Sequence, residues 1–384
     1  MSAVLETLTD YEAAGLKNHF CLADGHAYQD LHPSYQKIIR TLPQIWRDAA
    51  EQSIPDAELS FNKSFASFIN SPILENFTSN FKICPTASNS IDLIGATLNH
   101  LKHKVVMVEP TFDNLSLLLR RRGVNLDSFS DAAFFAAAES NEIENRLPGL
   151  KNYNALVLVH PNNPTGLVLS ENAFKNVIEF CIRHKIILIL DNCFRAYRRD
   201  NYYDYNILIQ SSVSFMTIED TGKVWPTQDL KASLVYFSDD LKNVFCQFYN
   251  EIYLCVSNLS LGILSAFFNE TASTGLKNTI WDLVDLRRRT LRKMISGSKL
   301  IVSEQSEHSN LSVEWLSYVD NDKNDFKICH ELKQLNLAVL PGRQFYWNSS
   351  EVHHNHKNIR ISLMKRESIF LIGMNILQKY CETL

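Results

Sequence analysis

The stretches VLVHPNNPTG (157–166) and DNCFRAY (191–197) decide the fold of this chain. The first ends an apolar run in a proline-containing turn with Asn163, and the second follows KIILIL (185–190) and begins with Asp191. Similar β-rich runs at 104–108, 213–218 and 232–237 alternate with helical patterns, which is typical of a parallel sheet covered by helices. The loops at the carboxyl ends of such strands are expected to carry the site.

The chain of 384 residues is too long for one small module, because single cores stop growing beyond about 250–300 residues. A long amphipathic helical pattern at 278–300 precedes a region of shorter strands and helices. The sequence therefore predicts three parts: an N-terminal arm at 1–30 that covers the active site, a large α/β domain at 31–275, and a small α+β domain at 276–384.

The composition is that of an ordinary globular protein. Hydrophobic residues make up 45%, charged residues 21%, and the net charge is -4, so there is no basic excess for nucleic acid or for acidic membranes. The N-terminus carries acidic residues where a signal peptide needs basic ones, and no apolar run reaches the ~18 residues of a membrane span. We expect a cytoplasmic protein with neither nucleic acid nor membrane as partner.

The cysteines and histidines do not form a metal-binding pattern. Eight cysteines are scattered without a Cys-x-x-Cys pair, so most are expected to be reduced core thiols. The histidine cluster His353, His354 and His356 lies in a polar, turn-like stretch, where a solvated loop is the alternative to a metal site. No metal is predicted.

Asn163 and Asp191 are the first candidates for functional residues of an active site. An Asn in a rigid turn suits a hydrogen bond to a phenolic oxygen, and a carboxylate at a strand end can pair with a protonated pyridine nitrogen. The structural alternative is that NNPTG is only a turn and that Asp191 only caps a helix.

Together with other motifs in the same order, these residues resemble the aminotransferase class I/II family, the fold type I enzymes of pyridoxal 5′-phosphate (PLP). The resemblance implies a large domain with a mostly parallel seven-stranded sheet. In EDTGKVWPTQDLK (219–231), Lys223 takes the place of the lysine that forms a Schiff base with PLP, and Lys231 that of a basic phosphate ligand. Asp191 matches the partner of the ring nitrogen, and Asn163 the ligand of the phenolic oxygen.

Three further motifs extend the resemblance. PTASNS (85–90) stands where the family binds phosphate with backbone N–H groups at a helix start, which points to Ala87, Ser88 and Asn89. Phe112, in EPTFDN (109–114), matches the aromatic ring stacked on the pyridine. Arg360, in NIRISL (358–363), matches the arginine that binds the substrate's α-carboxylate bidentately.

The chain departs from the usual family pattern around the cofactor. Phe194 replaces a tyrosine that hydrogen-bonds the phenolic oxygen, Lys231 replaces an arginine, and Thr86 replaces a common glycine. Asp220, three residues before Lys223, stands where a small hydroxyl residue is usual. A carboxylate at that point suits a cationic substrate, and Thr9, Glu12 and Asp24 in the arm add further oxygens.

The T-x-x-E pattern followed by LADGHAYQ (22–29) closely resembles one subgroup, the PLP-dependent L-arginine oxidases and hydroxylases of natural-product biosynthesis. That resemblance implies L-arginine as substrate and O2 as co-substrate, without metal or flavin. The implied products are 4-hydroxy-2-ketoarginine or the unsaturated ketoarginine, with hydrogen peroxide and ammonia. His26 matches the histidine linked to hydroxylation, although a histidine that caps a helix or lies in solvent is the structural alternative. A homodimer is also implied, and a tetramer is equally compatible.

Two other functions remain open from the sequence. A conventional aminotransferase for a basic or aromatic amino acid would share the cofactor residues, whereas the acidic arm and Phe194 favour the oxidase. An inactive protein that keeps the PLP scaffold would be expected to lack the lysine or the ring partner, and both Lys223 and Asp191 are present.

Overall fold

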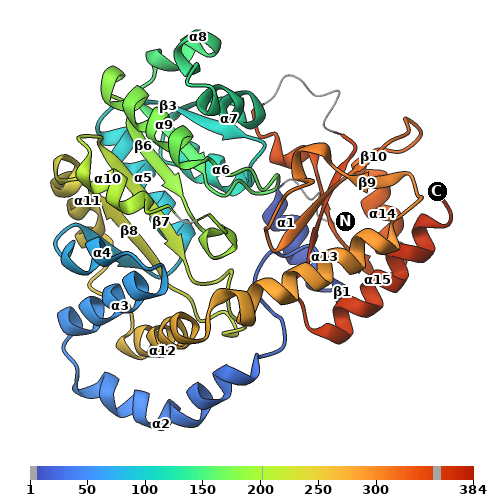
Figure 1. Ribbon diagram of the computed structural model, residues 1–384, viewed down its shortest axis with the longest axis horizontal. Helices are drawn as coiled ribbons and strands as arrows, with labels where there is room; N and C mark the ends of the chain where they lie inside the picture. Colours follow the sequence, from blue (N-terminus) through green and yellow to red (C-terminus); the bar gives the residue numbers. More distant parts are fainter. Residues whose placement is uncertain (1–6, 201, 349–355) are drawn as a thin grey trace.

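The computed structural model describes residues 7–200, 202–348 and 356–384 (Figure 1). A seven-stranded sheet forms the centre of the large domain, in the order β2-β8-β7-β6-β5-β3-β4. The bounds are β2 (Phe81–Cys84), β3 (Lys104–Glu109), β4 (Asn125–Ser130), β5 (Ala155–Val159), β6 (Ile187–Asp191), β7 (Phe215–Asp220) and β8 (Ser233–Phe237). β8 runs antiparallel to both of its neighbours, β2 and β7, and all other neighbouring pairs are parallel. The predicted fold, with a mostly parallel seven-stranded sheet, is confirmed.

Helices cover this sheet because its central strands are apolar on both faces. Every residue of β5 and β6 is buried, and α5 packs on β7 and β8 while α9 packs on β6. The main helices are α2 (Gln36–Glu51), α3 (Ile54–Phe68), α5 (Ala87–His100), α6 (Asp113–Arg121), α7 (Asp131–Glu139), α9 (Glu171–His184), α10 (Asp204–Gln210), α11 (Asp239–Ile252) and α12 (Asn258–Thr274). Their starts follow the sequence, since Thr86 and Ser170 accept N-cap hydrogen bonds from Asn89 and Ala173.

The small domain is built on a four-stranded antiparallel sheet in the order β12-β13-β10-β9. Its elements are β9 (Leu300–Val302), β10 (Val313–Tyr318), β12 (Leu340–Pro341), β13 (Asn358–Ser362), α14 (Asp325–Gln334) and α15 (Glu367–Cys381). The helix predicted at 278–300 is α13 (Asp282–Met294), which a π-turn at Lys277–Trp281 precedes. In Figure 1, α13 runs from the large domain across the small one.

Residues 7–30 form an arm that is joined to the small domain. Its helix α1 (Leu8–Gly15) starts at a capping box of Thr7 and Asp10. Its short strand β1 (Phe20–Cys21) pairs in parallel with β11 (Leu337–Ala338). The arm is therefore part of the folded domain and is held there by backbone hydrogen bonds.

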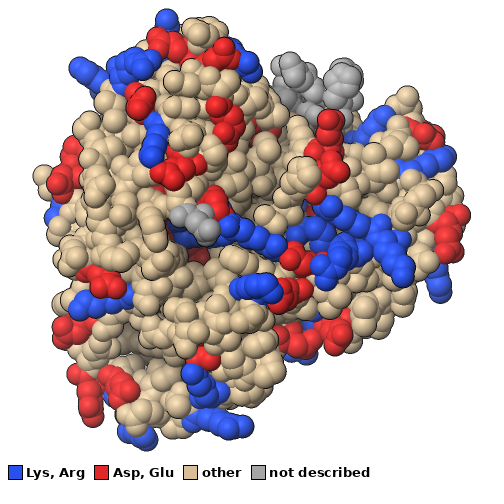
Figure 2. All heavy atoms as spheres, viewed as in Figure 1, with Lys and Arg blue, Asp and Glu red and all other residues tan. Residues whose placement is uncertain are grey.

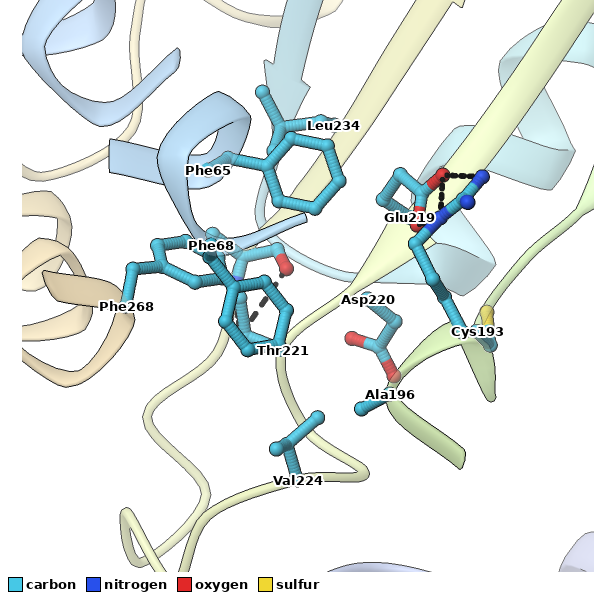
Figure 3. Close-up of a pocket in the computed structure, with 12 residues that line it drawn as sticks. Phe65, Phe68, Cys193, Ala196, Glu219, Asp220, Thr221, Val224, Leu234 and Phe268 are labelled. Atoms are coloured by element: carbon cyan, nitrogen blue, oxygen red, sulfur yellow. Dashed lines mark hydrogen bonds and ion pairs between the residues drawn. The ribbon is translucent and has the colours of Figure 1, made fainter. Parts of the chain in front are cut away.

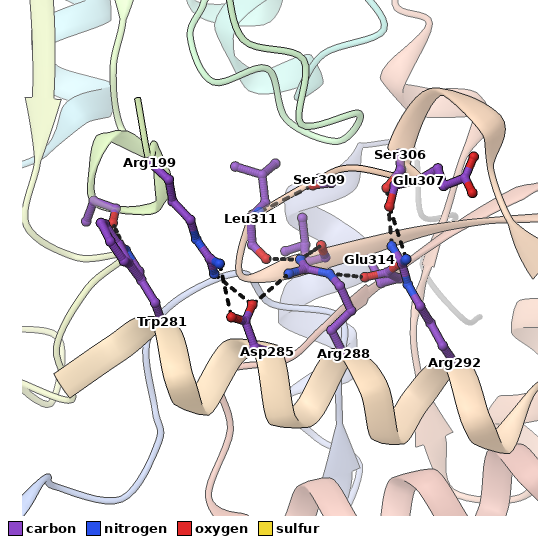
Figure 4. Close-up of polar contacts among 12 residues, drawn as sticks. Arg199, Trp281, Asp285, Arg288, Arg292, Ser306, Glu307, Ser309, Leu311 and Glu314 are labelled. Carbon is purple, nitrogen blue, oxygen red and sulfur yellow. Dashed lines mark hydrogen bonds and ion pairs between the residues drawn. The ribbon is translucent and has the colours of Figure 1, made fainter. Parts of the chain in front are cut away.

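Polar contacts of α13 tie the two domains together (Figure 4). Arg199, from the large domain, donates to both carboxylate oxygens of Asp285 at 3.0 and 2.7 Å. The Trp281 indole N–H donates to the carbonyl of Ala196 at 2.6 Å. Further along α13, Arg288 and Arg292 donate to the fully buried carboxylate of Glu314.

Charges of both signs are mixed on the face in Figure 2, with Lys and Arg side chains concentrated over α13. Among the described residues, no helix has the length and apolar character needed to cross a bilayer.

Candidate active site

A cavity of about 240 Å³ opens where the carboxyl ends of β5, β6 and β7 meet the arm and the small domain. Asn163 follows β5, Asp191 ends β6, and Asp220 and Lys223 come from the end of β7 and the loop after it. The cavity brings together most of the residues predicted from the sequence. They are Thr9, Glu12, His26, Ala87, Ser88, Phe112, Asn163, Asp191, Phe194, Asp220, Lys223, Lys231 and Arg360.

Two predicted site residues do not line the cavity. Asn89 is the third residue of α5 and takes part in the N-cap of this helix. Its backbone N–H donates to the Thr86 hydroxyl, and that hydroxyl donates to the Asn89 side-chain oxygen. Asp24 lies behind the cavity wall, where it contacts His26 and Lys365.

The start of α5 forms one end of the cavity and suits a phosphate group. Ala87 and Ser88 occupy the first turn, where helix N–H groups point out of the helix, and the Ser88 hydroxyl accepts a bond from Asn114 at 3.2 Å. Lys231 adds a cation on the same cavity wall. This set of donors fits the phosphate of PLP.

Asp191 fits the ring nitrogen of the same cofactor. It is buried, and its Oδ1 accepts the Cys193 backbone N–H at 2.9 Å. Burial raises the pKa of this carboxyl above its usual value, although the hydrogen bonds of Cys193 oppose the change. A protonated ring nitrogen would provide the positive charge that keeps Asp191 ionised.

Asn163 and Arg360 lie next to each other at the domain boundary. Arg360 Nη1 donates to Asn163 Oδ1 at 3.3 Å, which leaves the Asn163 amide nitrogen to donate to a ring oxygen. The turn that carries Asn163 requires Gly166, which has a positive φ of 79° and lies so close to Ser309 that any Cβ would clash. The residues present thus fit PLP at its phosphate, ring nitrogen and ring oxygen.

Arg360 is buried and already has a carboxylate partner from the arm. Its Nη2 donates to Glu12 Oε1 at 3.0 Å and to the Ala23 carbonyl at 2.8 Å. Burial lowers the pKa of the guanidinium, and the charges of Glu12 and Asp24 oppose this shift. Phe112 and Phe345 face the guanidinium carbon at 5.6 and 5.4 Å from their ring centroids.

Lys223 and its neighbours are held by the loop after β6. The Tyr197 hydroxyl donates to the Lys223 carbonyl at 2.6 Å, and Phe194 faces Lys223 Nζ at 6.0 Å from its ring centroid. Phe194 therefore presents an apolar ring to the cavity and no hydrogen-bond donor.

A buried ion pair at Glu219, which Figure 3 labels, ties the same loop to β7. Arg195 Nε donates to both oxygens of Glu219 at 2.8 and 2.9 Å. Phe65, Phe68 and Phe268 close a space of only about 10 Å³ beside Asp220, which is too small for a ligand.

One buried lysine near the site was not predicted from the sequence. Lys365 is 4% exposed, and its Nζ lies 3.7 Å from Asp24 Oδ2. The available signal was a lysine directly after the buried run NIRISLM (358–364), where a charged residue is unusual.

Side chains that could bind a metal ion do not gather at one point in the described residues. Over the parts of the chain that it describes, no group of three or more His, Cys, Asp or Glu side chains could hold a metal ion. His353 and His354, two members of the histidine cluster, lie outside the described residues.

Comparison with known proteins places the chain among similar folds. It resembles a structure of MppP soaked with the product 2-ketoarginine, with 29% identity, a TM-score of 0.83 and coverage of 94% of this chain and 99% of that chain. It also resembles aspartate aminotransferase from Thermus thermophilus bound to maleate, with 14% identity, a TM-score of 0.77 and coverage of 97% and 96%. A PLP-bound putative aminotransferase from Clostridium difficile 630 matches at 16% identity and a TM-score of 0.74, covering 96% and 95%.

Two curated relatives match over shorter segments. A probable aspartate/prephenate aminotransferase from Aquifex aeolicus is 24% identical over 205 residues, half of each chain. An LL-diaminopimelate aminotransferase from Prochlorococcus marinus is 24% identical over 135 residues, which span 35% of this chain and 32% of that relative. The model of the family "Aminotransferase class I and II" matches residues 27–369. With a cavity that fits PLP and this match over most of its length, the chain belongs to the aminotransferase class I and II family and is a PLP-dependent, aminotransferase-like enzyme.

Proposed function

We propose that this protein oxidises L-arginine with PLP as cofactor and O2 as electron acceptor. The products are 2-ketoarginine-type oxo acids, either 4-hydroxy-2-ketoarginine or the unsaturated ketoarginine. Electrons from the substrate reduce O2 to hydrogen peroxide, the amino nitrogen leaves as ammonia, and water supplies the hydroxyl oxygen of the hydroxylated product.

One observation carries the proposal: the cavity offers opposite charges for the two ends of one substrate. Arg360 suits a carboxylate and Asp220 suits a guanidinium; Glu12, which pairs with Arg360 in the structure, can join Asp220 once a substrate carboxylate displaces it. The likeness to MppP, whose structure was soaked with 2-ketoarginine, supports the same substrate class. An aspartate aminotransferase substrate would carry carboxylates at both ends and would be repelled by Glu12 and Asp220.

Each residue has a role that follows from its position. Bound PLP supplies an electron sink for the bond broken at the substrate's Cα. Lys223 Nζ takes the proton from Cα, and Asp191 holds the positive charge at the ring nitrogen. Arg360 orients the substrate through its carboxylate, and the arm with Thr9, Glu12 and His26 covers the cavity and excludes bulk water.

We also infer a homodimer. Enzymes of fold type I usually build their active sites at a dimer interface, and large apolar side chains such as Trp46 (65% exposed) and Leu254 (86% exposed) are available on the described surface for such contacts. Light scattering of the purified protein measures the mass in solution, and a monomer would contradict this inference.

The deciding experiment incubates the enzyme with L-arginine, PLP and air in the absence of any oxo acid. We expect oxygen uptake and hydrogen peroxide, and neither with Lys223→Ala. Mass spectrometry in labelled water identifies the oxo acid and the origin of its hydroxyl group. If no oxygen is consumed and the product forms only when an oxo-acid acceptor is added, the enzyme is a conventional aminotransferase.

A further inference from the structure

Three side chains form a row that runs from behind the cavity to its wall: Lys365, Asp24 and His26. Lys365 Nζ lies 3.7 Å from Asp24 Oδ2, and Asp24 Oδ1 lies 2.5 Å from His26 Nδ1. Asp24 is 3% and Lys365 4% exposed, and neither lines the cavity, whereas His26 does. The row therefore links a buried cation to the only ring of the arm that lines the cavity among the described residues.

The hydrogen bonds decide which nitrogen of His26 carries the proton in the neutral ring. An ionised carboxylate only accepts, so the Nδ1 atom that faces Asp24 must be the N–H. At the other end, Nε2 lies 3.3 Å from Lys231 Nζ, an ammonium that only donates. Both neighbours thus favour the same tautomer, with a lone pair on Nε2.

Asp24 is well suited to remain ionised. Burial alone would raise its pKa, but the hydrogen bond from His26 and the positive charge of Lys365 hold the pKa of this carboxyl well below its usual range. Its Oδ1 also accepts the His26 backbone N–H at 2.9 Å, which fixes the carboxylate relative to the ring.

Lys365 is the less expected member of the row. Burial lowers the pKa of its ammonium, and the negative charge of Asp24 opposes this shift. Its Nζ also lies 4.5 Å from the ring centroid of Tyr28, which adds a cation–π contact. A lysine buried in this way is costly unless its charge has a function or a partner.

The backbone holds the row together although its members are far apart in the sequence. Ser362 N–H donates to the Leu22 carbonyl at 2.7 Å, and Tyr28 N–H donates to the Met364 carbonyl at 2.9 Å. Residues 22–28 therefore run beside residues 362–365, which sets the distance between Asp24 and Lys365.

We propose that Lys365 and Asp24 are positioning residues that hold His26 as the Nδ1–H tautomer. The Nε2 lone pair, which faces Lys231 in the structure, becomes a proton acceptor for water in the cavity once Lys231 turns to the cofactor's phosphate. The proposal rests on the proposed function, because it assigns the hydroxylated share of the product to a correctly held imidazole. It also gives Asp24 a role different from contact with the substrate's guanidinium.

The test compares the wild type with Asp24→Asn, Lys365→Met and the charge-conserving Lys365→Arg, all as holoenzymes. The first readout is nitrogen NMR of protein labelled at histidine, with the His26 signals assigned by their loss in His26→Gln. In the wild type and in Lys365→Arg we expect a protonated Nδ1 and an unprotonated Nε2. In Asp24→Asn and Lys365→Met we expect a mixture of tautomers.

The second readout is the share of hydroxylated oxo acid among all oxo acids, a ratio that does not depend on the overall rate. We expect this share to fall about tenfold in Asp24→Asn and Lys365→Met and to recover in Lys365→Arg, since the loss of a residue that orients a functional histidine typically costs 10–100-fold. A rise in the arginine KM with an unchanged share would instead assign Asp24 to substrate binding and overturn the proposal.

The nitrogen NMR spectrum of the wild-type protein tests the proposed tautomer of His26 even if a variant does not fold. If Nε2 rather than Nδ1 carries the proton in the wild type, the proposal is wrong. If the wild type shows the expected tautomer but consumes no oxygen with arginine, the proposed function fails while the arrangement of the row stands.

Discussion

Glu12 and Arg360 form a buried ion pair of 3.0 Å, so that a carboxylate of the arm itself occupies the guanidinium proposed for the substrate's carboxylate. A substrate carboxylate must displace Glu12 before it can bind Arg360. Once displaced, Glu12 is a free anion at the cavity wall and can pair with a cation at the other end of the substrate.

The first prediction concerns selectivity. Glu12→Gln removes the charge that competes for Arg360 and also one anion that recognises a guanidinium. Both substrates gain from the lost competition at Arg360, but only arginine loses a guanidinium contact, so its binding should weaken by about 1.5–3 kcal/mol relative to that of norleucine. The ratio of kcat/KM for arginine over norleucine should fall about tenfold to a hundredfold.

Glu51→Gln, which changes an exposed carboxylate at the end of α2, is the control. An unchanged ratio removes guanidinium recognition from the role of Glu12.

The second prediction concerns the ring nitrogen. Asp191→Asn keeps the size of the side chain but cannot stabilise a positive charge. Visible absorbance should show that the cofactor is still bound, whereas turnover should fall about 10²–10³-fold, the usual effect of losing one electrostatic contact to a developing charge. Wild-type turnover in this variant would contradict the role of Asp191.

The third prediction concerns pH and the start of the arm. Asp113 Oδ2 accepts the Leu8 backbone N–H at 2.9 Å, and burial raises the pKa of Asp113 to about 6. The folded chain therefore holds a proton that the unfolded chain releases near its ordinary pKa of about 3.9. Stability from this group is complete at low pH and is lost as the pH rises through about 6, by roughly 3 kcal/mol in total.

Asp113→Asn is the matched control because an amide can still accept the Leu8 bond. Urea denaturation of both proteins between about pH 4 and pH 7 should show the wild type losing stability relative to the variant as the pH rises. A difference between the two that does not change with pH would contradict the raised pKa.

The fourth prediction concerns the buried charge that joins α13 to β10. Glu314→Gln leaves the buried Arg288 guanidinium with only the more distant carboxylate of Asp285, at 3.9 Å, which should destabilise the fold by about 3–5 kcal/mol. Glu171→Gln, in the exposed pair with Lys175, should cost less than about 0.5 kcal/mol. Thermal denaturation of both variants measures the contrast, and equal effects would show that the Glu314 network adds little.

The sequence predicted the central strands because their apolar runs are unmistakable. The runs at 104–108, 154–160, 185–190, 213–218 and 232–237 match β3, β5, β6, β7 and β8. It missed β2 and β4, which lie at the two edges of the sheet. In β4, the sequence NLDSFS is largely polar and only one of its residues is buried, so its pairing with β3 leaves little trace in the pattern.

The residues at strand ends were also predictable, because topology alone brings Asn163, Asp191 and Lys223 to one edge of the sheet. The network around Asp24 was not, since it depends on a contact between the arm and the segment after β13. A sequence pattern shows that Asp24 is a carboxylate but not that Lys365 lies beside it.

The arm is bonded to both halves of the molecule. Leu22 N–H donates to the Ala338 carbonyl of the small domain at 2.8 Å, and Ala27 N–H donates to the Gly222 carbonyl, next to Lys223, at 3.3 Å. Any hinge motion that separates the halves must stretch or break this short span, and His26 lies within it. The position of the imidazole therefore depends on contacts of the arm with both halves of the molecule.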